Sequence, residues 1–254
     1  YHSRTFMLPT ILIGPIALPT YPLLLLAALW AGMWLAARRA TQLGLDGDHV
    51  YNTGLYGLLA GLVGARVWFV LSHWENYAPN LTQALSLSRS ALSVGEGLVI
   101  AGLAALIYLQ RHNVPLRTFF DALAPGLALA VIIGNVGALL GGTALGLPAA
   151  VPWAVNIAGA ARHPIQGYEA GAALLILVLL LVGRRWRPWP GFFFWLFVAL
   201  YGLTRLFLEI FRAQPYLIGN GYLAVQVGAL AAVVVALAVM AYNFTGASGV
   251  EDQP

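Results

Sequence analysis

Seven mostly apolar runs, each about 20 residues long, follow one another along the chain. A helix of about 20 apolar residues spans the hydrocarbon core of a bilayer. Only 9% of the residues are charged, whereas about 25% is usual in soluble domains. We therefore predict an all-α integral membrane protein, a single bundle of about seven transmembrane helices. The predicted spans are Leu18–Ala36, Val50–Leu71, Leu92–Leu109, Phe119–Leu140, Ile165–Val182, Gly191–Phe211 and Tyr222–Tyr242.

The arginines indicate how this bundle is oriented. The loops that follow the first, third and fifth spans hold Arg38, Arg39, Arg111, Arg117, Arg184, Arg185 and Arg187. The other side holds fewer, namely Arg89, Arg162 and Arg212, with Arg4 in the N-terminal segment. Because cytoplasmic loops carry the excess of basic residues, we predict an extracytoplasmic N-terminus and a cytoplasmic C-terminus. Residues 1–244 then form one transmembrane domain, and residues 245–254 form a polar cytoplasmic tail.

Composition also bounds the kinds of site that the chain can carry. The sequence has no cysteine, which excludes disulfides, thiolate nucleophiles and cysteine metal sites. Its arginines lie in loops rather than in a basic stripe, so we expect no nucleic-acid partner. We predict no metal site and no cofactor. Gly57 and Gly61 form a pair with small-residue spacing, which indicates close helix packing rather than a phosphate-binding loop.

Ionisable side chains within the spans are costly, and by default they suggest function. Arg205 and Glu209 are four residues apart on one helix face, and Arg212 lies three residues further along it. One interpretation is a structural ion pair. The other is recognition of a phosphate headgroup, because a guanidinium binds phosphate oxygens in a bidentate fork. Five such residues fall on the predicted extracytoplasmic side: Arg66, Glu96, Glu169, Arg205 and Glu209.

Several segments match one known family in the order in which they occur. The most specific is Arg162-His-Pro-Ile-Gln-Gly-Tyr-Glu169-Ala, which is almost the family's RHPSQLYEA segment. Tyr201-Gly-Leu-Thr-Arg205, followed by Glu209 and Arg212, matches its sixth span. Further matches are Ile13-Gly-Pro-Ile16 with Tyr21, Gly61-Leu-Val-Gly-Ala-Arg66 with His73-Trp74, and Asp121-Ala-Leu-Ala-Pro-Gly126. On these segments the chain resembles the prolipoprotein diacylglyceryl transferases of bacterial cytoplasmic membranes.

The resemblance implies an activity. Members of the family transfer a diacylglyceryl group from phosphatidylglycerol to the thiol of a lipobox cysteine in a preprolipoprotein. The leaving glycerol phosphate needs fixed cationic donors, and the thiol must lose its proton. The resemblance assigns these tasks to two arginines and a histidine, supported by a signature like GRxGNFxNGExxG. Of this set the chain keeps Arg205, with Tyr21 and Glu169 as supporting matches.

The chain departs from the family at that signature, which aligns without gaps on residues 134–146. Asn135, Ala138 and Thr143 stand in place of the family's arginine, asparagine and glutamate, and Gly95 stands in place of its histidine. Glu96 follows Gly95 and is a candidate substitute base, because a carboxylate in an apolar site becomes a stronger base. The alternative is that Glu96 neutralises Arg66 or Arg205.

We therefore expect a catalytically degraded family member that serves as an accessory or lipid-binding subunit of a membrane protein assembly. The alternative is an active diacylglyceryl transferase with a rearranged site, in which Arg205 and Glu96 are catalytic. A small-molecule carrier fits less well, because the sequence has neither paired half-repeats nor broken spans in matching positions. The expected ligand is a phospholipid, phosphatidylglycerol in particular. The predicted headgroup-binding residues are Arg66, Tyr21, Asn135, Arg162, Glu169 and Glu209.

Overall fold

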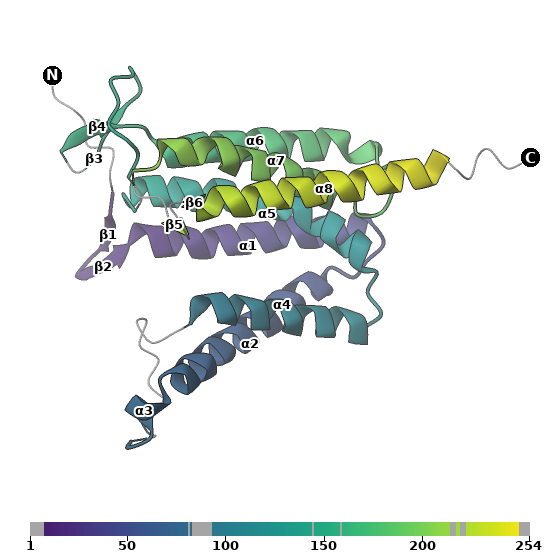
Figure 1. Cartoon of the computed structure of the whole chain (residues 1–254), viewed down its shortest axis with the longest axis horizontal. Helices are drawn as coiled ribbons and strands as arrows, with labels where there is room; N and C mark the ends of the chain where they lie inside the picture. Colours follow the sequence, from purple (N-terminus) through teal and green to yellow (C-terminus); the bar gives the residue numbers. More distant parts are fainter. Residues whose placement is uncertain are drawn as a thin grey trace, which may run out of the picture. The chain divides into compact units, whose positions relative to one another are not determined.

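The computed structural model describes residues 8–80, 82, 93–143, 145–157, 159–213, 217–218 and 222–248. Within these residues seven helices are long and apolar enough to cross a membrane, which confirms the predicted all-helical, seven-span architecture (Figure 1). The fold divides into two compact units, the first made of residues 1–36 and 120–254 and the second of residues 37–119. Arg4 and Arg89, used above for the orientation, lie outside the described residues, as does Leu92 at the predicted start of the third span.

The observed helices begin and end within a few residues of the predicted spans. The last helix reaches Ser248, so it includes the start of the predicted tail, and residues 249–254 lie outside the description. The spanning helices are α1 (Thr20–Gln42), α2 (Asp48–Ser72), α4 (Val94–Arg111), α5 (Leu116–Leu140), α6 (Ile165–Val182), α7 (Phe192–Leu208) and α8 (Ala224–Ser248). Shorter turns are α3 (Trp74–Tyr77), η3 (Gly183–Arg185) and η4 (Glu209–Phe211).

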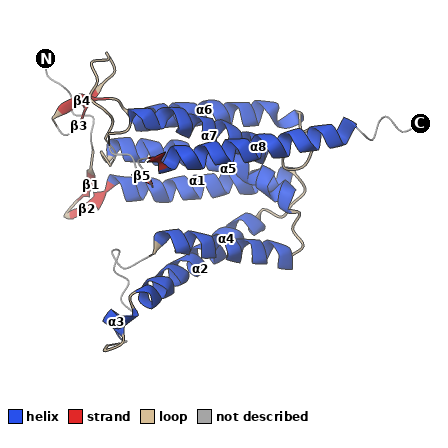
Figure 2. Cartoon of the chain, in the orientation of Figure 1, coloured by secondary structure: helices blue, strands red, loops and turns tan. Residues whose placement is uncertain are grey.

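Among the described residues, three small antiparallel hairpins accompany the helices, and the sequence did not predict them. Each hairpin precedes a spanning helix of the first unit, and all three lie at one end of that unit, which the arginine pattern predicts to be extracytoplasmic (Figure 2). The hairpins pair β1 (Thr10–Ile13) with β2 (Ile16–Pro19), β3 (Val155–Ile157) with β4 (Ala160–Arg162), and β5 (Leu217–Ile218) with β6 (Tyr222–Leu223).

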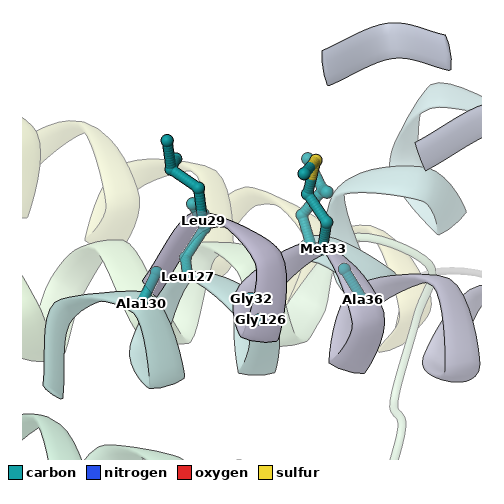
Figure 3. A pocket seen from close by; sticks show the side chains of 8 residues that line it. Leu29, Gly32, Met33, Ala36, Gly126, Leu127 and Ala130 are labelled. Carbon is teal, nitrogen blue, oxygen red and sulfur yellow. The ribbon is translucent and has the colours of Figure 1, made fainter. Parts of the chain in front are cut away.

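Helices α1, α5, α6, α7 and α8 of the first unit run alongside one another (Figure 1). Small residues allow close approach: a methyl group added at Gly126 of α5 would overlap the backbone oxygen of Gly32 in α1. An apolar hollow of about 90 Å³ lies beside this crossing, with Leu29 and Met33 projecting at its edge (Figure 3). The buried core joins α5, α6 and α7 through Ala124, Ala128, Ile176, Leu177, Leu180, Phe192, Phe193 and Phe197.

A buried carboxylate of α5 fixes the start of α7. The Asp121 side chain is fully buried and accepts hydrogen bonds from the Gly191 amide at 2.7 Å and the Phe194 amide at 3.1 Å. It also forms an ion pair with Arg187, whose Nε lies 2.9 Å away. The first amides of a helix have no partner within the helix, and a negative charge there is favoured by the helix dipole. Asp121 therefore caps α7 from a neighbouring helix.

Replacing Asp121 with alanine is expected to destabilise the first unit by about 3–5 kcal/mol, because it leaves Arg187 and two helix-start amides without their buried acceptor. The midpoint of thermal unfolding in detergent measures the effect. Glu75→Ala, at an exposed acid of α3, is the matched control and should leave the midpoint unchanged. An Asp121→Ala midpoint equal to that of the control would contradict the capping role.

The second unit is built on the close pairing of α2 with α4. A methyl group at Gly61 would lie 2.9 Å from the Ala101 side chain, and one at Gly97 would lie 2.6 Å from the Ala65 side chain. Contacts this short exclude any larger residue without movement of the helices. The glycines of α2 therefore act in close helix packing, as their spacing predicted.

Candidate functional site

Four charged side chains of the first unit form one network, which we call the ion-pair cluster: Glu169, Arg205, Glu209 and Arg212. Arg205 donates through Nη1 to Glu169 Oε1 and through Nη2 to Glu209 Oε2, the latter at 3.1 Å. Arg212 donates through Nη2 to Glu169 Oε1 at 2.9 Å and through Nε to Glu209 Oε2 at 3.2 Å. Each arginine thus bridges both carboxylates, and the predicted pairing of Arg205 with Glu209 is confirmed.

The ion-pair cluster is largely buried. The Glu209 and Glu169 side chains are 1% and 6% exposed, whereas those of Arg205 and Arg212 are 21% and 20% exposed. Two guanidiniums and two carboxylates give the cluster a formal net charge of zero. The carboxylates are therefore the buried inner part of the cluster, and the guanidiniums form its accessible part.

Three of these four side chains lie at adjoining ends of α6 and α7, because of where they occur in the sequence. Glu169 lies one turn after the start of α6, which follows Pro164. Arg205 lies in the last turn of α7, which passes directly into η4 at Glu209. The chain direction of α6 and α7 therefore brings their charged ends to the same end of the first unit. The two helices pack directly against each other, so the contact needs no intervening element.

A short three-stranded ladder positions Arg212. Residues 145–149 lie between β4 and the segment after η4, with bridges from Gly146 to Arg212 and from Pro148 to Arg162. Backbone hydrogen bonds hold the ladder on both sides: Leu147 N to Phe211 O at 2.8 Å, Ala213 N to Leu145 O at 3.0 Å, and His163 N to Leu147 O at 3.0 Å. A methyl group at Gly146 would overlap the backbone oxygen of His163, so only glycine fits there.

Arg162 lies at the edge of this ladder rather than in the ion-pair cluster. Its Nη1 donates to the Gly146 oxygen at 3.0 Å and its Nε donates to the Ile157 oxygen at 3.3 Å. In these contacts Arg162 ties the β3–β4 hairpin to the segment at Gly146. Its predicted role in headgroup binding stays a prediction.

His163 and Tyr168 join a second polar chain on the same end of the unit. The Trp153 indole donates to the Tyr168 hydroxyl at 2.7 Å, and that hydroxyl lies 3.1 Å from Nδ1 of His163. The His163 ring also packs against Phe211, with 4.9 Å between ring centroids. These contacts hold residues 162–164 (Arg-His-Pro) against η4, beside the ion-pair cluster.

Tyr21 lies at the start of α1, beside the chain end of α5, and Asn135 lies within α5. A methyl group at Gly141 would lie 3.0 Å from the Tyr21 side chain, so the two residues are in close contact. The Asn135 amide donates to the Val131 oxygen of its own helix at 3.0 Å. Both side chains are partly buried in the first unit. Their predicted contact with a headgroup is untested.

Arg66 and Glu96 belong to the second unit. Arg66 is 7% exposed in α2, and its guanidinium carbon lies 5.2 Å from the ring centroid of Tyr77. Glu96 lies in the first turn of α4 and is exposed. The structure describes this unit by itself, so it leaves the catalytic role predicted for Glu96 untested, and equally the headgroup role predicted for Arg66.

Sequence reasoning missed one residue that fixes the start of α7 and one that shapes the site. Asp121 appeared only as part of a matched segment, although an acid inside an apolar span signals a buried partner. Gly146 entered only as the last residue of the aligned signature, and its contact with His163 joins residues that are 17 positions apart. The hairpins that create the contact are too short to leave a periodic pattern.

Comparison with known proteins finds similarity along most of the chain. Residues 9–244 match the family described as prolipoprotein diacylglyceryl transferase. The phosphatidylglycerol–prolipoprotein diacylglyceryl transferase of Thermus thermophilus is 31% identical, over 80% of this chain and 83% of that protein. The protein of that name from Mycobacteroides abscessus is 28% identical, over 94% of this chain and 77% of its own length. The one from Clostridioides difficile is also 28% identical, over 78% and 80%.

Proposed function

Because the chain belongs to the prolipoprotein diacylglyceryl transferase family, we propose that it transfers a diacylglyceryl group from phosphatidylglycerol to the cysteine thiol of a prolipoprotein. It is a multi-pass membrane protein of a family that resides in the bacterial cytoplasmic membrane. The names of its relatives support an active transferase better than the accessory subunit expected from the sequence.

One observation carries the chemical part of the proposal: Arg205 and Arg212 lie side by side on the same two carboxylates. Their partly exposed guanidiniums are a pair of fixed cationic donors of the kind that binds phosphate oxygens. Donors that are already in place stabilise the charge of a leaving phosphate without reorganisation. In this proposal the two arginines bind the phosphodiester of phosphatidylglycerol, and they hold the glycerol phosphate as it leaves.

The buried carboxylates have a separate task. Glu169 and Glu209 hold both guanidiniums in position before lipid binds, because each carboxylate bridges the two arginines. A guanidinium that is hydrogen-bonded to two carboxylates keeps its orientation when a ligand binds. Electrostatic catalysis depends on donors that are fixed in this way. The cluster thus acts as a pre-formed phosphate site at the predicted extracytoplasmic end.

A phospholipid-binding role without transfer is the second candidate. Asn135 favours this candidate, because it aligns with an arginine of the family. The Asn135 side-chain amide donates a hydrogen bond to the Val131 oxygen of its own helix. A neutral amide offers no compensation for phosphate charge. In this alternative the ion-pair cluster would bind a lipid headgroup without any transfer, and the protein would be a subunit of a membrane protein assembly.

A bacterial strain whose own diacylglyceryl transferase is repressed distinguishes the two candidates. Expression of this chain should restore the diacylglyceryl mass on a reporter lipoprotein, measured by mass spectrometry, and the Arg205→Ala variant should not. If the chain is present in the membrane and the reporter keeps its unmodified mass, the transfer proposal is wrong. Phosphatidylglycerol that co-purifies with that inactive chain would then support the second candidate.

A further inference from the structure

Arg162 differs from the other arginines at the end of the first unit where the hairpins lie (Figure 2). Arg205 and Arg212 each pair with both carboxylates of the ion-pair cluster. Among the described residues, Arg162 meets no carboxylate and donates only to backbone oxygens, from Nη1 to Gly146 at 3.0 Å and from Nε to Ile157 at 3.3 Å. Carbonyl oxygens are neutral, so they orient the guanidinium without compensating its charge.

The Arg162 guanidinium also keeps donors for a ligand. A guanidinium carries five N–H groups, and these two contacts use the one on Nε and one of the two on Nη1. The other three have no acceptor among the described residues, and the side chain is only partly buried. The backbone of Arg162 is fixed, since it pairs with Val155 of β3 on one side and with Pro148 on the other. Arg162 is thus an oriented, partly exposed cation.

The net charge at this end of the unit matches that of an anionic phospholipid. The ion-pair cluster is formally neutral, so Arg162 gives the described charged side chains there, three arginines and two glutamates, one positive charge in excess. Phosphatidylglycerol carries one negative charge, on its phosphodiester. Phosphatidylethanolamine carries an ammonium group as well and is neutral overall. An excess positive charge favours the first lipid over the second, because an uncompensated charge beside a bilayer is costly.

Arg162 lies close enough to the ion-pair cluster to act on the same headgroup. Its Nη1 contacts the oxygen of Gly146, and Gly146 pairs with Arg212 in the ladder. Arg162 and Arg212 occupy the two outer strands of that ladder, so about 10 Å separates their backbones, twice the usual strand spacing. Salt screens exposed charges over about 8–10 Å, and partly buried charges less. A phosphate bound by Arg212 therefore lies within the range of the Arg162 charge.

We propose that Arg162 determines the headgroup specificity of the protein, because it supplies the positive charge that selects an anionic phospholipid over a zwitterionic one. The inference rests on the headgroup binding in the proposed function, in which Arg205 and Arg212 bind the phosphodiester. A phosphodiester is common to both classes of lipid, and the carboxylates of the cluster cancel the charge of those two arginines. Arg162 adds the charge that distinguishes phosphatidylglycerol, and its contacts with Gly146 and Ile157 position the guanidinium for that task.

A lipid competition read by native mass spectrometry tests this specificity without any transfer step. The protein in detergent receives equal amounts of phosphatidylglycerol and phosphatidylethanolamine with the same acyl chains, and the masses of the bound lipids give the ratio in which it retains them. The wild type should retain at least about tenfold more phosphatidylglycerol. Arg162→Gln should lower that ratio about tenfold, the usual effect of losing one hydrogen bond to a charged group.

Further variants separate the charge of Arg162 from its contacts in the ladder. Arg162→Lys keeps the charge but not the planar fork that reaches both backbone oxygens, so its ratio should stay within about threefold of the wild type. Arg185→Ala, at an exposed arginine of η3, is the matched control and should keep the wild-type ratio. If Arg162→Gln does not fold, Arg162→His replaces it. Its ratio should be about tenfold higher at about pH 5.5 than at about pH 8, because an imidazole is charged only at the lower pH.

The outcomes separate this inference from the transferase proposal. A wild-type ratio for Arg162→Gln, or a ratio for Arg162→His that does not change with pH, overturns the role of Arg162 in specificity. Equal losses for Arg162→Gln and Arg162→Lys also overturn it, because they would show that Arg162 only holds the ladder, and so does a wild type that binds the two lipids equally. A protein that selects phosphatidylglycerol but leaves the reporter lipoprotein unmodified would end the transferase proposal and keep this role of Arg162.

Discussion

Replacing Arg205 with alanine is expected to lower the rate of diacylglyceryl transfer by about 10²- to 10³-fold, the usual effect of removing one fixed donor from a transition state. Arg205 contacts both buried carboxylates, and its guanidinium is among the accessible donors of the ion-pair cluster. The rate of mass gain by a lipobox peptide, with the protein in phosphatidylglycerol nanodiscs, measures the effect.

Two further variants test whether the loss of transfer rate is specific to the guanidinium of Arg205. Arg205→Lys keeps the charge but not the planar fork that bridges Glu169 and Glu209, so it should recover only a small part of the rate. Arg185→Ala removes an exposed arginine from η3 in the same unit and should transfer at the wild-type rate. A wild-type rate for Arg205→Ala would exclude the cluster from the chemistry.

Replacing Gly146 with alanine is expected to lower both stability and activity, although Gly146 carries no chemistry. The added methyl group overlaps the His163 backbone oxygen, so the ladder must open. We expect a loss of about 3 kcal/mol in unfolding free energy, the upper end of the range for overpacking. Because Arg212 pairs with Gly146 in the ladder, its guanidinium should move, and a displacement of about 1 Å costs roughly 100-fold in rate.

Gly171→Ala is the matched control for this prediction. Gly171 lies in α6, and a methyl group there meets nothing within 4 Å. This variant should keep the wild-type midpoint of thermal unfolding and the wild-type transfer rate. Equal midpoints and rates for Gly146→Ala and Gly171→Ala would show that the ladder does not position Arg212.

The spans could be predicted because membrane insertion imposes a length and an apolar composition that the sequence displays directly. The pairing of Arg205 with Glu209 could also be predicted, since a spacing of four residues places both on one helix face. These features depend on a single helix. Local periodicity is sufficient to find them.

The rest of the site, and the capping of α7 by Asp121, depend on contacts between segments that are distant in the chain. Glu169 meets Arg205 across 36 positions, and Asp121 meets the Gly191 amide across 70. Neither pairing follows from helix periodicity, which says which face a residue occupies but not which helix covers it. The ladder at Gly146 involves segments of only a few residues, below the length at which strand alternation is recognisable.

The central claim is that this chain moves a diacylglyceryl group to a cysteine. Its most direct test is an in vitro transfer reaction with purified protein, phosphatidylglycerol labelled in its headgroup glycerol, and a lipobox peptide. The account predicts that the peptide gains the mass of one diacylglyceryl group and that an equal amount of labelled glycerol phosphate is released. A peptide with serine in place of cysteine should release none. An unmodified peptide, beside a control transferase that modifies it in the same lipid, would contradict the claim.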